Sequence, residues 1–272
     1  MSLEEELLFA RDLAQKAGQI AQARQSHLSV TYKPHNQGPV SDAEIYIDDL
    51  IRKSINERFP HDGMVTEESY DNGPLPQAHR VWFVDPIDGT SSYVKGRDDY
   101  VVMIGLAIGG QASLGAICHP ASNTTWYGMR NKSSSVCYKM QDSTLTKIHL
   151  VSAPQHKEIT IVMSRFHISR KQQFLNEKIA AQNIKKMSSV GLKAMTVIDK
   201  DADLYVCWSR RVHLWDTCAP LAIVRASGGF MGYVNGQEPS YCDTIHHNMP
   251  LFVSNFHPDQ ELAEFILNLA QS

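Results

Sequence analysis

Cysteine is scarce in this chain of 272 residues, and its spacing gives no sign of a cysteine metal site. The five cysteines are far apart, and no two of them form a Cys-x-x-Cys pair. Zinc ribbons and disulfide-stapled domains depend on closely spaced or paired cysteines, so both classes are disfavoured. Unpaired cysteines fit a reducing compartment, and we therefore expect a cytoplasmic protein.

Long apolar runs and a surplus of one charge are missing as well. No stretch approaches the roughly 20 apolar residues that span a bilayer. The acidic start, Met1–Glu6, lacks the basic and apolar parts of a signal peptide. A formal net charge of −3 gives no electrostatic basis for binding nucleic acid or a membrane surface. We expect neither partner, and the sequence leaves both a monomer and a homodimer open.

The residue pattern changes character near the middle of the chain. Hydrophobic residues make up 43% of the sequence, enough for one large domain or two closely packed ones. The first half predicts helices followed by antiparallel strands, whereas the second half alternates strands and helices, as an α/β layer does. We expect a metal-binding α+β subdomain at residues 1–149 and a substrate-binding α/β subdomain at residues 150–272.

Individual elements follow from periodicity and from punctuating residues. Apolar residues at three- and four-residue spacing predict helices, and short apolar or β-branched runs predict strands. Ser41 and Glu44 match a capping box, which predicts a helix start near Ser41, and Gly228-Gly229 marks a helix end. The predicted helices are 3–21, 41–59, 171–181, 191–198 and 216–227, and the predicted strands are 81–84, 100–108, 113–118, 124–127, 135–138, 158–163 and 202–208.

The most informative segment is Asp85-Pro86-Ile87-Asp88-Gly89-Thr90, which directly follows the apolar run Val81–Val84. The run predicts a buried strand that leads two carboxylates into a tight turn, where unpaired charge would be costly. A hard divalent cation such as Mg²⁺ is the natural partner of clustered carboxylates and of a substrate phosphate. The Ile87 carbonyl is placed to face the same metal, and Thr90 is placed to open a phosphate-binding helix. The alternative is an ordinary surface turn.

Other acidic residues are candidates for the same site, and each has a simpler explanation. Glu67 and its neighbour Glu68 lie upstream of the Asp motif, and a solvated loop would also explain them. Asp216 precedes the last predicted helix, where an N-cap would explain it. Glu44 already has a role in the capping box, and it could in addition orient a water molecule.

Basic and aromatic residues gather in the second half, in Ser164-Arg165-Phe166-His167, at Lys193 and in Arg210–His213. Surface charge is the simpler interpretation of each. Next to a metal centre, however, they would hold a second anionic group and a ring. The chain contains no P-loop, G-x-G-x-x-G turn, G-x-S-x-G elbow or H-E-x-x-H helix.

Taken in order, Glu67-Glu68-Ser69, Asp85–Thr90, Trp215-Asp216 and Gly228-Gly229 resemble the motifs of the inositol monophosphatase superfamily. These are magnesium-dependent, lithium-sensitive phosphatases, and the resemblance extends from about Lys33 to Gly229. It implies a layered α-β-α-β-α sandwich and two or three Mg²⁺ ions as cofactor.

The resemblance also implies roles for single residues. The metal ligands would be Glu67, Asp85, the Ile87 carbonyl, Asp88 and Asp216. Gly89 and Thr90 would receive the phosphate, and Thr90 would help to position the attacking water. Glu44 stands where the superfamily usually has aspartate. The catalytic residues would then be Thr90, Glu44 and Asp88.

Within the superfamily, Ser164–His167, Gly191-Leu192-Lys193 and Leu214–Thr217 resemble the 3'(2'),5'-bisphosphate nucleotidase branch, although Phe166 replaces a serine. That branch would place His167 near adenine and Lys193 near the 5'-phosphate. The implied activity is removal of the 3'-phosphate from adenosine 3',5'-bisphosphate, a step linked to sulfur metabolism. The alternatives are a phosphatase for inositol or other sugar phosphates, and a non-catalytic sensor of a phosphate ligand. The substrate contacts would come from Glu67, Ile87, Asp88, Gly89, Thr90, Ser164, His167, Lys193 and Asp216.

Overall fold

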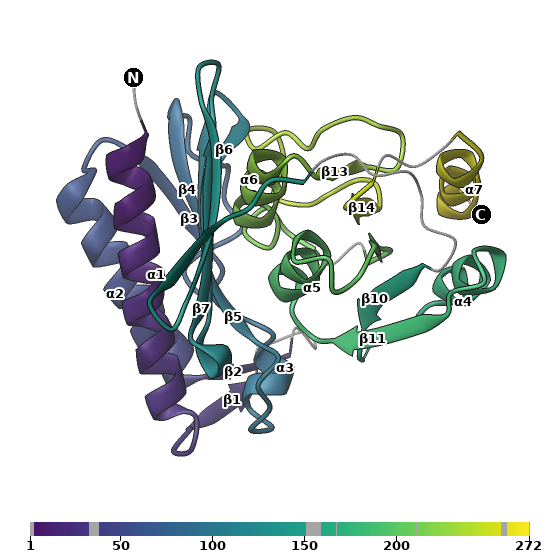
Figure 1. The fold of residues 1–272 in the computed structure, drawn as a ribbon. Coiled ribbons are helices and arrows are strands. Elements are labelled where there is room, and N and C mark those ends of the chain that lie inside the picture. Colours follow the sequence, from purple (N-terminus) through teal and green to yellow (C-terminus); the bar gives the residue numbers. More distant parts are fainter. Residues whose placement is uncertain are drawn as a thin grey trace.

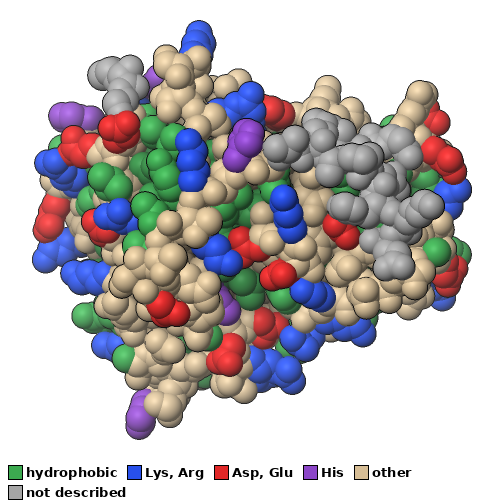
Figure 2. Space-filling view, viewed as in Figure 1, with side chains coloured by type: hydrophobic (Ala, Val, Ile, Leu, Met, Phe, Trp, Pro, Cys, Tyr) green, Lys and Arg blue, Asp and Glu red, His purple; other side chains and the backbone are tan. Residues whose placement is uncertain are grey.

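Five layers make up the protein in the computed structural model, in the order helix, sheet, helix, sheet, helix (Figure 1). The predicted α-β-α-β-α sandwich is therefore confirmed. The described residues are 3–32, 38–150, 159–166, 168–209, 212–256 and 260–271. Within these ranges, no helix combines the length and the apolar character needed to cross a membrane. Acidic and basic side chains are interspersed on the face seen in Figure 2.

The first layer consists of α1 (Glu4–Arg24) and α2 (Asp42–Arg58), which pack on one face of the first sheet. α1 turns a row of fully buried alanines inward, so the helix can lie close to the strands. The capping box predicted for α2 is present, with Ser41 and Glu44 bonded reciprocally. A short hairpin that the sequence did not predict, β1 (Val30–Tyr32) and β2 (Pro39–Ser41), leads into α2.

The first sheet has seven strands in the order β3-β4-β5-β6-β7-β8-β9. Only the β3–β4 pair is parallel, and every other neighbour is antiparallel. The strands predicted for the first half are all found, and β3 and β9 are additional. The strands are β3 (Gly63–Thr66), β4 (Arg80–Asp88), β5 (Val101–Ile108), β6 (Gln111–His119), β7 (Thr124–Arg130), β8 (Ser135–Gln141) and β9 (Thr144–Lys147).

A bulge near the end of β4 replaces the tight turn that the sequence suggested. Pairing with β5 continues to Asp88, but the register shifts, since Asp85 faces Met103 and Asp88 faces Val101. Three steps along β4 therefore match two along β5, which is the geometry of one extra residue. In a regular strand, residues three apart point to opposite faces. The extra residue brings Asp85 and Asp88 to the same face, while Ile87 packs in the core beneath α1 and α2.

The second sheet has five strands in the order β11-β10-β12-β14-β13. β10 pairs in parallel with β11 and β12, whereas β14 is antiparallel to both of its neighbours. Its strands all follow residue 159, so each sheet comes from one half of the chain; the subdomain division at residue 149 itself stays a prediction. The strands are β10 (Thr160–Ser164), β11 (Asn183–Met187), β12 (Leu204–Cys207), β13 (Phe230–Tyr233) and β14 (Leu251–Ser254).

The helices α5 (Val190–Ile198) and α6 (Cys218–Ser227) fill the layer between the two sheets. α6 packs so closely on the first sheet that a Cβ on Gly105 would lie 2.6 Å from the Ala219 nitrogen. α6 ends at Gly228, with a positive φ of 91°, as predicted. The other α-helices of the described residues are the short α3 (Thr90–Tyr93), and α4 (Arg170–Lys178) and α7 (Gln260–Gln271) on the far face of the second sheet. A 3₁₀ turn, Pro120–Ser122, follows β6.

Candidate active site

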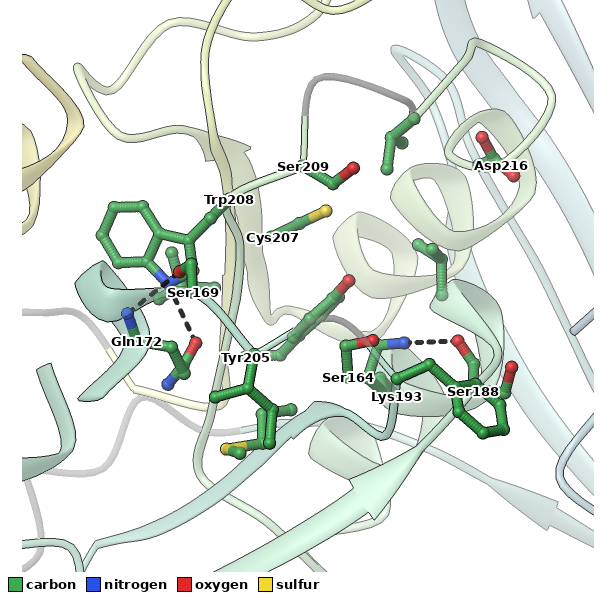
Figure 3. Close-up of a pocket in the computed structure, with 16 residues that line it drawn as sticks. Ser164, Ser169, Gln172, Ser188, Lys193, Tyr205, Cys207, Trp208, Ser209 and Asp216 are labelled. Carbon is green, nitrogen blue, oxygen red and sulfur yellow. Dashed lines mark hydrogen bonds between the residues drawn. The ribbon is translucent and has the colours of Figure 1, made fainter. Parts of the chain in front are cut away.

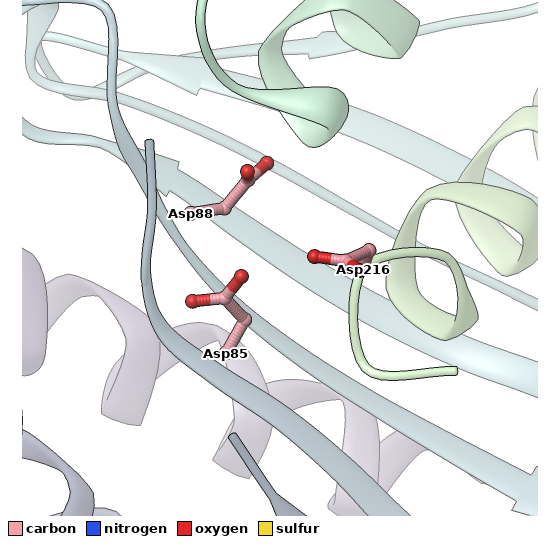
Figure 4. A group of neighbouring side chains, drawn as sticks. All are labelled: Asp85, Asp88 and Asp216. Carbon is pink, nitrogen blue, oxygen red and sulfur yellow. The ribbon is translucent and has the colours of Figure 1, made fainter. Parts of the chain in front are cut away.

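Three aspartates converge where the two halves of the chain meet. Carboxylate oxygens of Asp85, Asp88 and Asp216 all lie within 4.8 Å of one another. Two of these residues come from the bulge of β4, and Asp216 comes from the loop before α6 (Figure 4). The sequence predicted this meeting of distant acids, and such a group could hold a metal ion.

A bound cation would stabilise the ionised form of the clustered carboxylates. Burial, and next the charge of Glu67, raise the pKa of Asp85 well above its ordinary value. Burial and the nearby charge of Asp216 raise the pKa of Asp88 to about 6. The buried Oδ1 of Asp85 has no hydrogen-bond partner among the described residues. A divalent cation would offset the repulsion between the carboxylates and would give the Asp85 oxygen a partner. A site made only of oxygen donors suits Mg²⁺.

The second half of the chain holds Asp88 in place. Its Oδ2 accepts hydrogen bonds from Ser189 Oγ at 2.6 Å and from the Gly191 nitrogen at 2.7 Å. Ser189 Oγ also accepts from the Leu192 nitrogen at 2.8 Å and so caps α5. A side chain at position 191 would collide with Met103. The N-terminus of α5 therefore orients this carboxylate, a contact that the sequence did not predict because an N-cap serine looks purely structural.

The interpretation of Asp216 as a helix cap is wrong. The N-cap residue of α6 is Thr217, and it makes no side-chain capping bond. Asp216 Oδ2 instead accepts a hydrogen bond from the His213 nitrogen at 2.6 Å. The loop before α6 thus orients this carboxylate toward the other two aspartates.

Glu67 and Ile87 lie beside the aspartates without belonging to the closest group. The Glu67 nitrogen donates to the Val84 carbonyl at 3.1 Å, which ties the segment after β3 to β4. The charge of Glu67 acts on the pKa of both Asp85 and Glu44. The Ile87 carbonyl lies 3.2 Å from Thr90 Oγ1. The roles of Glu67 and of the Ile87 carbonyl as metal ligands stay a prediction.

Gly89, Thr90 and Glu44 form a second part of the site. Gly89 has a positive φ of 107°, and a Cβ there would lie 2.9 Å from the Asp99 carbonyl oxygen, so the position requires glycine. Thr90 Oγ1 lies 2.6 Å from Glu44 Oε1. Burial raises the pKa of Glu44 to about 7, although hydrogen bonds from Thr90 and Ser41 oppose the shift. Glu44 therefore caps α2 with one oxygen and holds Thr90 with the other.

A cavity of about 570 Å³ adjoins the aspartates and is lined by second-half residues (Figure 3). Asp216 lies on one side and Trp208 on the other, with Tyr205 and Lys193 between them. The indole nitrogen of Trp208 donates to Gln172 Oε1 at 2.9 Å, which fixes the ring. Ser164 lines the cavity, and its role as a substrate contact stays a prediction. His167 and Arg210-Arg211 lie outside the described residues.

The basic residues near the cavity already have protein partners. Lys193 is 1% exposed, and its Nζ donates to the Ser188 carbonyl at 2.8 Å. Burial lowers the pKa of Lys193, partly offset by the charge of Asp88. Arg165 Nε donates to Asp99 Oδ2 at 3.0 Å. Sequence reasoning overlooked Asp99 because it belongs to no motif.

Comparison with known proteins gives consistent results at the family level. The model of the "Inositol monophosphatase family" matches residues 2–270. The 3'(2'),5'-bisphosphate nucleotidase CysQ of Buchnera aphidicola is 28% identical over 218 residues, covering 80% of this chain and 79% of that protein. Inositol monophosphatase 2 of Homo sapiens is 26% identical over 236 residues, covering 84% and 80%. Relatives with different substrates in their names are thus similarly close.

A solved structure gives the same architecture. An IMPase of Thermotoga maritima superposes with a TM-score of 0.80 and 21% identity, and the match covers 98% of each chain. At this identity the likeness shows the fold alone. The sequence match and the fold therefore agree, and the choice of substrate depends on the cavity.

Proposed function

Because the chain belongs to the inositol monophosphatase family and is therefore a metal-dependent phosphomonoesterase, we propose that it removes the 3'-phosphate of adenosine 3',5'-bisphosphate with Mg²⁺. The observation that carries the proposal is the cavity, which begins at the aspartates and ends at a fixed aromatic ring. Its volume is in the usual range of about 300–1,000 Å³ for ligand pockets. It offers room for a nucleoside beyond the phosphate.

Mg²⁺ would be held by the residues around the bulge of β4 and by the loop before α6. When bound, the metal supplies positive charge for the phosphate and for the leaving oxygen, and it lowers the pKa of an attacking water. The partnerless oxygen of Asp85 and the raised pKa of Asp88 support this use of the cluster. The proposed ligands are Glu67, Asp85, the Ile87 carbonyl, Asp88 and Asp216.

Thr90 and Glu44 would orient the attacking water. The Thr90 hydroxyl carries one proton, and donating it to the ionised Glu44 leaves the hydroxyl lone pairs available. The hydroxyl then accepts a hydrogen bond from a water, whose own lone pair is turned toward phosphorus. Gly89 and Thr90 open α3 beside this point, so their backbone amides would receive a phosphate oxygen. Positioning of this kind supplies much of the rate in phosphoryl transfer.

The second half would recognise the nucleoside. Trp208 offers an aromatic surface for a base, and stacking of this type is worth about 1–3 kcal/mol per base. Lys193 lines the cavity between Trp208 and Asp216, where a 5'-phosphate would lie, and its ammonium group carries three donors. The resemblance to bisphosphate nucleotidases also supports this assignment, as does the Buchnera relative with that name.

The test is phosphate release with Mg²⁺ from adenosine 3',5'-bisphosphate and from inositol 1-phosphate, measured in parallel as kcat/KM. We expect a preference for the nucleotide of at least about tenfold, the value of one charged hydrogen bond. A preference for the inositol ester would retain the metal chemistry and overturn the nucleotide assignment. No turnover on a broad panel of phosphomonoesters would favour a phosphate-binding sensor instead.

A further inference from the structure

One carboxylate outside the aspartate cluster joins the two halves of the chain beside it. Asp99 lies in the connection between α3 and β5, and its side chain is 13% exposed. Its Oδ2 accepts hydrogen bonds from Arg165 Nε at 3.0 Å and from the Ser188 nitrogen at 2.9 Å. Both donors belong to the second half, so this single oxygen connects the first sheet to β10 and to the start of α5.

Arg165 is held on its other side as well. Its guanidinium donates to the Lys186 carbonyl at 2.7 Å, and its backbone nitrogen donates to the Met187 carbonyl at 3.0 Å. The planar guanidinium therefore lies between Asp99 and the end of β11. A lysine could not make both side-chain bonds at once, because it lacks the fixed fork of donors.

The bonded segment continues directly to the aspartate cluster. Ser188 is tied to Asp99, and the next residues, Ser189 and Gly191, both donate to Asp88. Ser188 thus anchors a stretch of four residues whose other end holds the Asp88 carboxylate. Hydrogen-bonded partners of metal-binding carboxylates set the orientation of those carboxylates.

We propose that Asp99 and Arg165 are positioning residues for the metal centre. Together they fix segment 188–191, and this segment keeps Asp88 turned toward Asp85 and Asp216. The inference rests on the proposed metal-dependent function. It also assigns Arg165 a role different from the one its sequence suggested, which was to hold a second anionic group of the substrate.

The chain offers a matched control at the opposite end of α5. Asp199 is 11% exposed in its side chain and pairs with Lys139 at 2.6 Å. It also accepts a hydrogen bond from the Trp126 indole at 3.0 Å. This pair joins the same helix to the same sheet, with burial like that of the Asp99–Arg165 pair, but it does not touch the segment that holds Asp88.

The experiment compares Asp99→Ala, Arg165→Lys and the control Asp199→Ala. Alanine is used because asparagine would keep one acceptor oxygen, and a single oxygen of Asp99 accepts both bonds. We expect Asp99→Ala to raise the Mg²⁺ concentration for half-maximal activity about 10–100-fold, and Arg165→Lys to act in the same direction. The double variant should add little to Asp99→Ala, since both residues act through one connection. Asp199→Ala should lower the Tm and leave the Mg²⁺ response unchanged.

Two readouts do not depend on turnover. In metal-free protein, amide hydrogen exchange of residues 188–191 should be faster in Asp99→Ala than in wild type and unchanged in Asp199→Ala. Calorimetric titration of Asp99→Ala with Mg²⁺ alone should show the same 10–100-fold weakening. If wild type binds Mg²⁺ but hydrolyses no phosphate ester while these two changes occur, the proposed function fails and the positioning role stands. Unchanged exchange and Mg²⁺ affinity in a folded Asp99→Ala, or an equal effect of Asp199→Ala, would overturn the positioning role.

Discussion

The two ends of the candidate site are built differently. At the acid end, Asp85 and Asp88 are buried at the end of a strand of the first sheet, and their carboxylates lie close to that of Asp216. At the cavity end, the walls come from loops and from the second sheet, and the basic side chains are already bonded to protein groups. The carboxylates of the acid end therefore repel one another, whereas the basic side chains of the cavity end already have hydrogen-bond partners.

The difference indicates that the acid end would supply the general chemistry and the cavity end would select the substrate. Clustered carboxylates at the acid end suit any phosphate ester, because a bound metal and a phosphate would balance their charge. Under the proposed function, the cavity end would distinguish substrates by shape and by its aromatic wall. Part of its charge, however, serves the acid end, since Lys193 and Arg165 both hold the segment before α5. Mutations at the two ends should therefore separate general chemistry from substrate choice.

The largest expected effect is that of Asp88→Asn. Asparagine keeps the size of the side chain and one acceptor oxygen, but it removes the charge that would hold the metal. Turnover should fall by about 10³-fold or more on every substrate, while the fold survives. Steady-state kcat, with Mg²⁺ occupancy and circular dichroism measured on the same sample, checks this.

Asp62→Asn is the control for the acid end. Asp62 accepts hydrogen bonds from Arg80 and Trp82 near the start of β4, whereas Asp85 and Asp88 lie near the end of that strand. Its loss should lower the Tm and leave kcat within about threefold of wild type, as usual for sites outside the chemistry. An Asp88→Asn variant with near-wild-type kcat and full metal occupancy would contradict the proposed centre.

The acid end was predictable from sequence because its residues stand in short motifs with strong local patterns. The bulge that makes Asp85 and Asp88 share a face was not, since its register depends on pairing with β5. β11 was missed because Asn-Ile-Lys-Lys-Met is largely polar and exposed, as an edge strand can be. The Asp99–Arg165 pair joins residues 66 positions apart and belongs to no motif, so only the tertiary structure reveals it.

A smaller and selective effect is expected from Lys193→Met. If the ammonium binds a second phosphate, KM for adenosine 3',5'-bisphosphate should rise about 10–100-fold, as for loss of a charged hydrogen bond. KM for a singly phosphorylated substrate should rise less, since it loses only the effect of the bond to the Ser188 carbonyl. If Lys193 only braces Ser188, both substrates should be affected alike and the Tm should fall. Lys200→Met, which changes an exposed lysine just after α5, controls for the loss of one positive charge.

A pH-dependent change in stability is expected at Glu44. Burial, the main cause, raises the pKa of this carboxyl to about 7 from an ordinary 4.5. A raised carboxyl pKa stabilises the fold below about pH 4.5, and this contribution is lost as the pH rises through about 7. Metal-free wild type should therefore lose up to roughly 3 kcal/mol of stability relative to Glu44→Gln across this range.

The measurement is the Tm of both proteins with a chelator, at several pH values from 4.5 to 7.5. The Tm of wild type relative to that of Glu44→Gln should fall toward the upper end of this range. Glu44→Gln should also be less active with Mg²⁺, because its amide has one acceptor oxygen and cannot accept from both Ser41 and Thr90 as the carboxylate does. Adding Mg²⁺ should narrow the difference in Tm, since a nearby cation favours the ionised form. Parallel Tm profiles of the two metal-free proteins would show that folding does not raise the pKa of Glu44. The repulsion between carboxylates at the acid end would then be confined to the three aspartates.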